Sequence, residues 1–131
     1  MELDLKKWFI TLAVIVGLGV YINTHYTYKD VLKFAKSHPS SEYSPKLEYM
    51  AGMSQYLKSR YPESIEAFTQ LLTDYPTCQY APKALLRIGT AYSEQSKWEE
   101  ARTSFQRYLD EYPSGPDAEI VREKHEIIKF K

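Results

Sequence analysis

The residues that most often carry out chemistry in proteins are few in this chain and far apart. Its three histidines, His25, His38 and His125, and its single cysteine, Cys78, show no metal-ligand spacing and no nucleophile motif. The chain also has no glycine-rich phosphate loop and no His-Glu-x-x-His zinc motif. We therefore predict no catalytic site, no metal site, no cofactor and no small-molecule substrate.

The charged residues exclude a second class of function. Lys and Arg together number 17, as do Asp and Glu, so the formal net charge is zero. Nucleic-acid binding proteins need a basic excess to neutralise phosphates. The acidic stretches KWEEAR and YLDEYP are typical of solvated helix faces rather than of an acid/base pair. We predict a protein that is not an enzyme and does not bind nucleic acid.

An uncharged apolar run, residues 8–22, lies near the start of the sequence. Extended back to Leu3 it has about 20 residues, or roughly 30 Å of helix, which matches the core of a bilayer. Trp8 and Phe9 lie at one end and Tyr21 at the other, as in the aromatic belts of membrane proteins. We predict that residues 1–26 form an N-terminal transmembrane anchor that contacts the lipid bilayer through residues 8–22.

Two other interpretations of this run are open. It could be a cleaved signal peptide, with Gly17 and Gly19 near the cleavage site, although no Ala-x-Ala sequence follows. It could be a buried core helix, but so small a domain has no second apolar layer to enclose it. No cysteine follows the run directly, which argues against a lipoprotein. We favour an uncleaved, single-pass anchor, and Lys6 and Lys7 before it favour a cytoplasmic N-terminus.

The remaining sequence repeats with a period of 37 residues, which is typical of repeat proteins. Three kinds of residue keep this interval: Pro39, Pro76 and Pro113; Gly52 and Gly89; Phe68 and Phe105. Apolar residues at helical spacing predict two helices in each repeat. Ser96 and Glu99 suggest a capping box at the start of the last of these helices. Small residues would allow the two helices to cross closely, and the expected packing positions are Gly52, Phe68, Gly89, Tyr92, Ala101 and Phe105.

These positions resemble the tetratricopeptide repeat (TPR). Five residues of the second repeat fall at the spacing of that family: Gly89, Tyr92, Ala101, Phe105 and Pro113. In the first repeat Gln55 and Ser64 replace the Tyr and the Ala. The longer link between repeats is similar to that of a bacterial cell-envelope subclass, which includes the outer-membrane-assembly lipoprotein and the periplasmic coordinator of the Tol–Pal system. The resemblance implies an all-α fold, a short helical-hairpin solenoid after the single transmembrane helix.

The register of the repeats divides the chain. We predict a TPR domain over residues 27–131, made of a half repeat at 27–39, full repeats at 45–76 and 82–113, and a capping helix at 117–128. We expect one nearly continuous helix across residues 19–39, with the membrane segment in the place of the missing first helix. Glu126 replaces Gly89 in the last element, so no further helix is expected to cross there.

In TPR proteins the first helix of each repeat lines the concave, partner-binding face. The family's spacing implies the following residues there: Lys46, Tyr49, Met53, Tyr56, Lys83, Leu86 and Thr90. Lys46 and Lys83 alone do not make the clamp that some members use for a peptide carboxylate. Tyr49, Met53 and Tyr56 suit contact with a protein segment. The alternative is that these three side chains pack on the helix around residues 31–36.

Together these features predict a non-enzymatic, membrane-anchored TPR scaffold. It would be an accessory subunit of a bacterial membrane protein complex, with other subunits of that complex as partners. We expect it in the inner (cytoplasmic) membrane, with the TPR domain in the periplasm. The alternative is a periplasmic cell-envelope assembly adaptor that captures client peptides in its groove.

Overall fold

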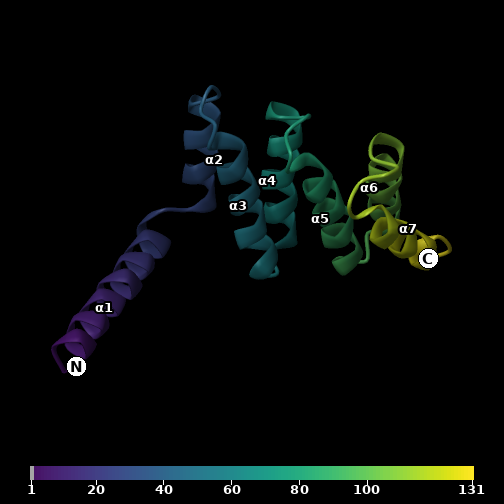
Figure 1. Cartoon of the computed structure of the whole chain (residues 1–131). Helices are drawn as coiled ribbons and strands as arrows, with labels where there is room; N and C mark the ends of the chain where they lie inside the picture. The colour runs from purple at the N-terminus through teal and green to yellow at the C-terminus, as the bar shows by residue number, and fades with distance from the viewer. Residues whose placement is uncertain (1) are drawn as a thin grey trace.

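The computed structural model describes residues 2–131, and over this range all regular secondary structure is helical, which confirms the expected fold class. The helices are α1 (Glu2–His25), α2 (Tyr28–Ser37), α3 (Ser44–Leu57), α4 (Tyr61–Asp74), α5 (Ala81–Glu94), α6 (Trp98–Glu111) and α7 (Ala118–Ile128). Helices α2 to α7 stand side by side in one row, and α1 extends away from the end of the row (Figure 1).

Each complete repeat is a hairpin of two antiparallel helices, α3 with α4 and α5 with α6, that cross at a glycine. A Cβ atom added to Gly52 would lie 2.6 Å from ring carbons of Phe68, and one added to Gly89 would meet the ring of Phe105 in the same way. Both rings are buried. In the first hairpin the Ser64 hydroxyl also donates a hydrogen bond to the Gly52 carbonyl at 2.9 Å. The absent side chain of each glycine is therefore replaced by a phenyl ring from the facing helix.

The links between hairpins share one backbone geometry. A hydrogen bond recurs before each first helix, from the backbone N–H of Ser44 to Ser41 O, of Ala81 to Cys78 O and of Ala118 to Gly115 O, at 3.2, 3.1 and 3.1 Å. Tyr75 and Tyr112 then reach back with their hydroxyls to the carbonyls of Pro39 and Pro76, at 3.4 and 3.5 Å. Since the link after α2 matches the other two, α2 is the counterpart of the second helices α4 and α6.

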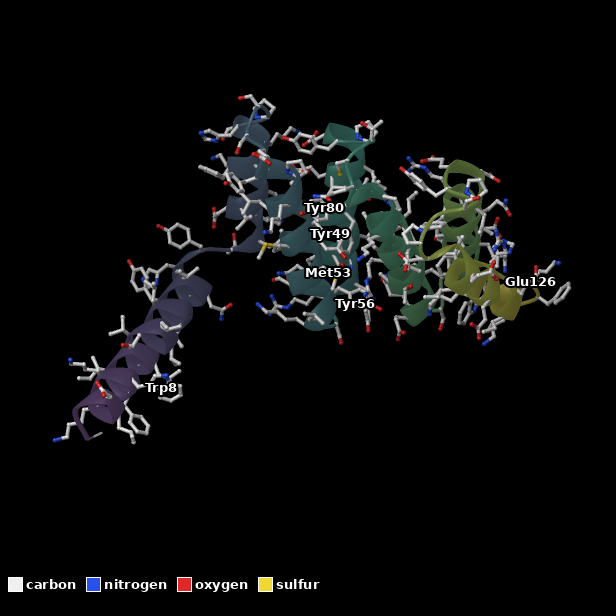
Figure 2. All side chains as sticks on the ribbon, in the orientation of Figure 1. Trp8, Tyr49, Met53, Tyr56, Tyr80 and Glu126 are labelled. Carbon is white, nitrogen blue, oxygen red and sulfur yellow. The ribbon has the colours of Figure 1, made fainter. Side chains whose placement is uncertain are left out.

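Helix α7 closes the far end of the row. Its Val121 and Ile128 are buried, whereas Glu126 stands on the surface at the end of the row (Figure 2). The Arg102 guanidinium donates hydrogen bonds to the carbonyls of Ile128 and Lys131, at 3.2 and 2.8 Å. A last helix with one apolar and one polar face is what a solenoid needs as a cap.

The expected continuous helix across residues 19–39 is wrong. Helix α1 ends at His25 and α2 begins at Tyr28, because Thr27 and Asp30 form a capping box between them. The backbone N–H and the hydroxyl of Thr27 both donate to the Asp30 carboxylate, at 2.7 and 2.8 Å. After this break α1 points away from the row instead of lying along α2, so it does not take the place of the missing first helix (Figure 1).

The expected capping box at Ser96 is also wrong. Helix α6 has Lys97 as its N-cap, and Ser96 adopts a left-handed backbone with φ of 56°. Ser59, 37 residues earlier, has φ of 57°. The N–H of Lys97 bonds to Tyr92 O at 2.9 Å and the N–H of Ser96 to Ser93 O at 3.0 Å, which is the Schellman pattern of a helix C-terminus. Each serine occupies a position that glycine usually fills, and so the turn carries local strain.

The crossing in the second hairpin predicts a large effect of one methyl group. Gly89→Ala should lower the free energy of unfolding by about 1–3 kcal/mol, because the added Cβ would clash with the buried Phe105 ring and force it to shift. Combining it with Phe105→Leu should give less destabilisation than the sum of the two single changes. Thermal unfolding of the full chain in a mild detergent measures the stability of the three variants. If the effects of the two single changes simply added up in the double variant, the close contact of Gly89 with Phe105 would be contradicted.

The strained turns predict a stabilising substitution. Ser96→Gly should raise the free energy of unfolding by roughly 0.5–1 kcal/mol, because glycine adopts the left-handed conformation without a Cβ clash. Thr103→Gly, in the middle of α6, should lower it by a few tenths of a kcal/mol. The same melting experiment compares the two variants, and a Ser96→Gly protein that melts below the wild type would rule out the strained turn.

Candidate protein-binding face

Four side chains form a line along the side of α3 that faces α5, and we call Tyr80, Tyr49, Met53 and Tyr56 the aromatic column (Figure 2). Tyr49, Met53 and Tyr56 share one face of α3 because they are four and three residues apart. Tyr80, the N-cap residue of α5, stacks on Tyr49 with ring centroids 5.1 Å apart and planes at 23°. All four side chains are half-buried, so each presents part of its surface to solvent.

Two tyrosines of the column, Tyr49 and Tyr56, also pack against side chains outside it. Tyr49 also packs against the buried ring of Phe68, with centroids 5.6 Å apart. Tyr56 meets Tyr61 edge-on at 5.6 Å, and the Arg87 guanidinium lies 5.2 Å from the centre of the Tyr56 ring. Burial raises the pKa of the Tyr56 phenol, although the cation of Arg87 acts in the opposite direction. The side chains of Tyr80, Tyr49 and Tyr56 are therefore packed against neighbouring rings or a guanidinium group.

The column answers the question that the sequence left open about Tyr49, Met53 and Tyr56. They do not pack on α2, where Leu32 forms a small separate cluster with residues of α3 and α4. Tyr49 and Met53 instead pack against the main core of the row, from the side of α5.

The other residues expected on this face have different positions. Lys46 and Lys83 are exposed, one on each first helix. Thr90 is half-buried, and its hydroxyl donates to the carbonyl of Leu86 at 2.8 Å. The expectation for Leu86 is wrong, because its side chain is buried in the main core and is not free to meet a partner.

Sequence reasoning missed two members of this face, Tyr80 and Arg87. A signal for Tyr80 exists, since Tyr43 occupies the equivalent place one repeat earlier. Tyr43 is 67% exposed, because no first helix of a preceding repeat stands beside α3 to offer it a stacking partner. The column thus needs two adjacent first helices, and only the α3 and α5 pair supplies it with tyrosines.

A buried carboxyl group lies beneath the face, at a position where the next repeat has Leu85. Glu48 of α3 is fully buried. Its Oε1 accepts a hydrogen bond at 2.8 Å from the Gln70 amide, which also donates to the carbonyl of Leu32 at 3.1 Å. This amide joins α2, α3 and α4.

The second oxygen of this carboxyl group faces another acid. Within the described part of the chain, Oε2 of Glu48 and Oδ2 of Asp74 have no other donor. Burial raises the pKa of Glu48 to about 7. The hydrogen bond from Gln70 acts against this rise, the neighbouring Asp74 carboxyl group adds to it, and the charge of Lys36 opposes it weakly. A proton shared by the two acids satisfies both oxygens.

The residues predicted to anchor the chain lie on α1. Trp8, Phe9 and Tyr21 are all more than half exposed, and the apolar helix around them is not buried against the row. Trp8 stands near the free end of the helix (Figure 2). Within residues 4–131, whose side chains the structure describes, no group of His, Cys, Asp and Glu could hold a metal ion.

Comparison with protein families gives a match over much of the chain. The family model YfiO, described as outer membrane lipoprotein, matches residues 44–122. The match covers more than half of the chain, begins at the first residue of α3 and ends within α7. It confirms the resemblance to TPR proteins of the bacterial cell envelope, and it leaves α1 and α2 outside. A search of curated proteins found no match.

The buried acid predicts a pH dependence of stability. The pKa of Glu48 rises from an ordinary value of 4.5 to about 7 on folding, so between these values the folded chain holds a proton that the unfolded chain has lost. The stability that this proton contributes is complete below pH 4.5 and is lost as the pH rises through 7. The melting temperature of the full chain in a mild detergent should fall across this window.

Two variants test the assignment. Glu48→Gln keeps a donor toward Asp74 without titrating, so its melting temperature should not fall in this window and should exceed that of the wild type at pH 8. Glu42→Gln, on the exposed link before α3, should behave as the wild type does. An unchanged pH profile in Glu48→Gln would assign the effect to another group.

Proposed function

Because the chain belongs to the YfiO family of outer membrane lipoproteins, we propose that it is a non-enzymatic, membrane-anchored scaffold of the bacterial cell envelope. In this proposal it is an accessory subunit of a membrane protein complex, held through protein–protein contacts. The observation that carries the proposal is the aromatic column. It offers a fixed, half-exposed strip of three tyrosines and a methionine and no group suited to catalysis.

The composition of the column supports a protein partner. Tyrosine combines a large apolar ring with a polar hydroxyl and has few rotatable bonds, so its ordering on binding loses little entropy. Methionine adapts to irregular surfaces. Lys46 and Lys83, on the same helices, add positive charge at the border of the strip. This combination suits a protein segment that has apolar side chains and some acidic ones.

In this proposal helix α1 takes the role that a lipid has in a lipoprotein. The only cysteine, Cys78, lies in the link between α4 and α5 and is half-buried, far from the apolar segment in sequence. Helix α1 is long and apolar enough to cross a membrane, and its large apolar side chains from Leu5 to Ile22 are exposed. We place the anchor in the inner membrane and the helical row in the periplasm.

A second function of the same face is an adaptor that captures client peptides. The aromatic column favours this alternative as well, because an open strip along one helix can take an extended peptide. The two functions differ in the partner, which is a stable subunit in the first and a series of exchanging clients in the second.

Site-specific photo-crosslinking in native membranes tests the proposal. A photoreactive phenylalanine at Met53, in the column, should link the chain to one discrete protein, because Met53 is partly exposed between two fixed tyrosines. The same group at Thr103, exposed on the second helix α6, should give much less of this product. A ladder of many products at Met53 would favour the client adaptor, and equal yields at the two positions would contradict a binding function of this face.

A further inference from the structure

A cavity of about 570 Å³ lies where α1 meets the row, and the proposed function does not use it. Its walls come from the end of α1, the start of α2 and one side of α3. Ile22, Leu47 and Met50 supply an apolar wall, and Tyr26 and Tyr28 stand beside it. The cavity is therefore apolar on one side and polar on the other.

The polar side of the cavity carries three cations, Lys29, Lys58 and Arg60, and no carboxylate lines it. Within the part of the chain that the structure describes, none of the three forms an ion pair. Lys58 donates a hydrogen bond to the Asn23 side chain of α1 at 3.3 Å, which joins the two walls.

Three acids lie near the cavity but do not line it, Asp30, Glu63 and Glu66. The Asp30 carboxylate accepts from Thr27, and the Glu66 carboxylate accepts from the Tyr28 hydroxyl at 2.9 Å. These acids keep their negative charge, but within the described part of the chain none of them forms an ion pair with Lys29, Lys58 or Arg60.

The position of the cavity decides which anion it would meet. Figure 1 shows the segment after α1 entering the row at the edge that also holds the α3–α4 and α5–α6 turns. Acidic residues also lie along this edge, at Glu63, Glu94, Glu99 and Glu100, but none of them lines the cavity. A helix that crosses a bilayer leaves it among the phospholipid headgroups, so the cavity at the end of α1 would face them.

We propose that this junction cavity binds the headgroup of an anionic phospholipid. The inference rests on the proposed role of α1 as a membrane anchor. The phosphate lies among Lys29, Lys58 and Arg60, and the glycerol end of the acyl chains lies against Ile22 and Met50. Such a contact fixes the row relative to the membrane, because it joins α1 to α3 across the break at Thr27.

Native mass spectrometry of the full chain in a mild detergent tests the proposal, with dioleoyl phosphatidylglycerol and dioleoyl phosphatidylcholine as probes. The wild type should bind the anionic lipid several-fold more tightly than the zwitterionic one. Lys58→Gln combined with Arg60→Gln should weaken phosphatidylglycerol binding by roughly tenfold or more, since each cation near a lipid surface contributes about one factor of five. Phosphatidylcholine binding should hardly change.

Lys97→Gln is the matched control, because Lys97 occupies the place of Arg60 in the second repeat and lies away from α1. It should bind phosphatidylglycerol as the wild type does. Circular dichroism melts of all variants check that the fold is intact. Equal binding of the two lipids, or wild-type affinity in the double variant, would overturn the proposal. Displacement of the lipid by millimolar inorganic phosphate would show a free-phosphate site instead.

Carbonate extraction of membranes separates this inference from the proposed function. The wild type and the double variant should both stay in the pellet, because α1 and not the cavity would hold the chain in the bilayer. Release of the wild type would refute the anchor, whereas the lipid titration in detergent would still decide on the cavity.

Discussion

The contact of a glycine on one helix with a phenyl ring on the next is the constraint on which the row depends. Gly52 receives Phe68 and Gly89 receives Phe105, so each hairpin closes at a distance that a side chain at the glycine would prevent. The close crossing of the two helices in each hairpin fixes the distance between them. The three links, which follow α2, α4 and α6, share one backbone turn. In a solenoid each repeat contacts only its neighbours, so one repeated local geometry fixes the whole architecture.

Because the architecture follows from one repeated local contact, the fold could be predicted from the sequence. The prediction was wrong at places where no repeated residues indicate the structure. Gly, Phe and Pro that recur at a fixed period indicate where the helices cross and end, because few residue types fit at those positions. No repeated residues indicate the break between α1 and α2. Its signal in the sequence is local, the capping box of Thr27 and Asp30. The turn before α6 was misassigned because Ser96, rather than glycine, adopts the left-handed conformation, and a serine before a glutamate resembles an N-cap.

The candidate site was only partly predictable for a different reason. Tyr49, Met53 and Tyr56 follow from helical spacing within one element, but Tyr80 and Arg87 join them from the next repeat. Leu86, at the position equivalent to Tyr49, is buried in the main core, whereas Tyr49 is half-buried and packs against that core from the side of α5. Glu48 was missed because a charged residue is not expected at a core position. Its position is that of a core leucine, and only the neighbouring Gln70 and Asp74 show how a carboxyl group is accommodated there.

The two unusual features at the start of the row, the acid Glu48 and the break before α2, act on the same element. Helix α2 has no first helix in front of it, and it packs mainly on α3 and, to a smaller extent, on α4. Part of that hold is the Gln70 amide, which bonds both to the α2 backbone and to Glu48. Loss of the Glu48 proton would leave two carboxylates, Glu48 and Asp74, facing each other near α2. Repulsion between them would weaken the packing of α2 on α3 and α4. Because α2 connects the row to the proposed anchor, the protonation of one buried acid and the contacts of α1 with α3 would together decide how rigidly the binding face is held above the membrane.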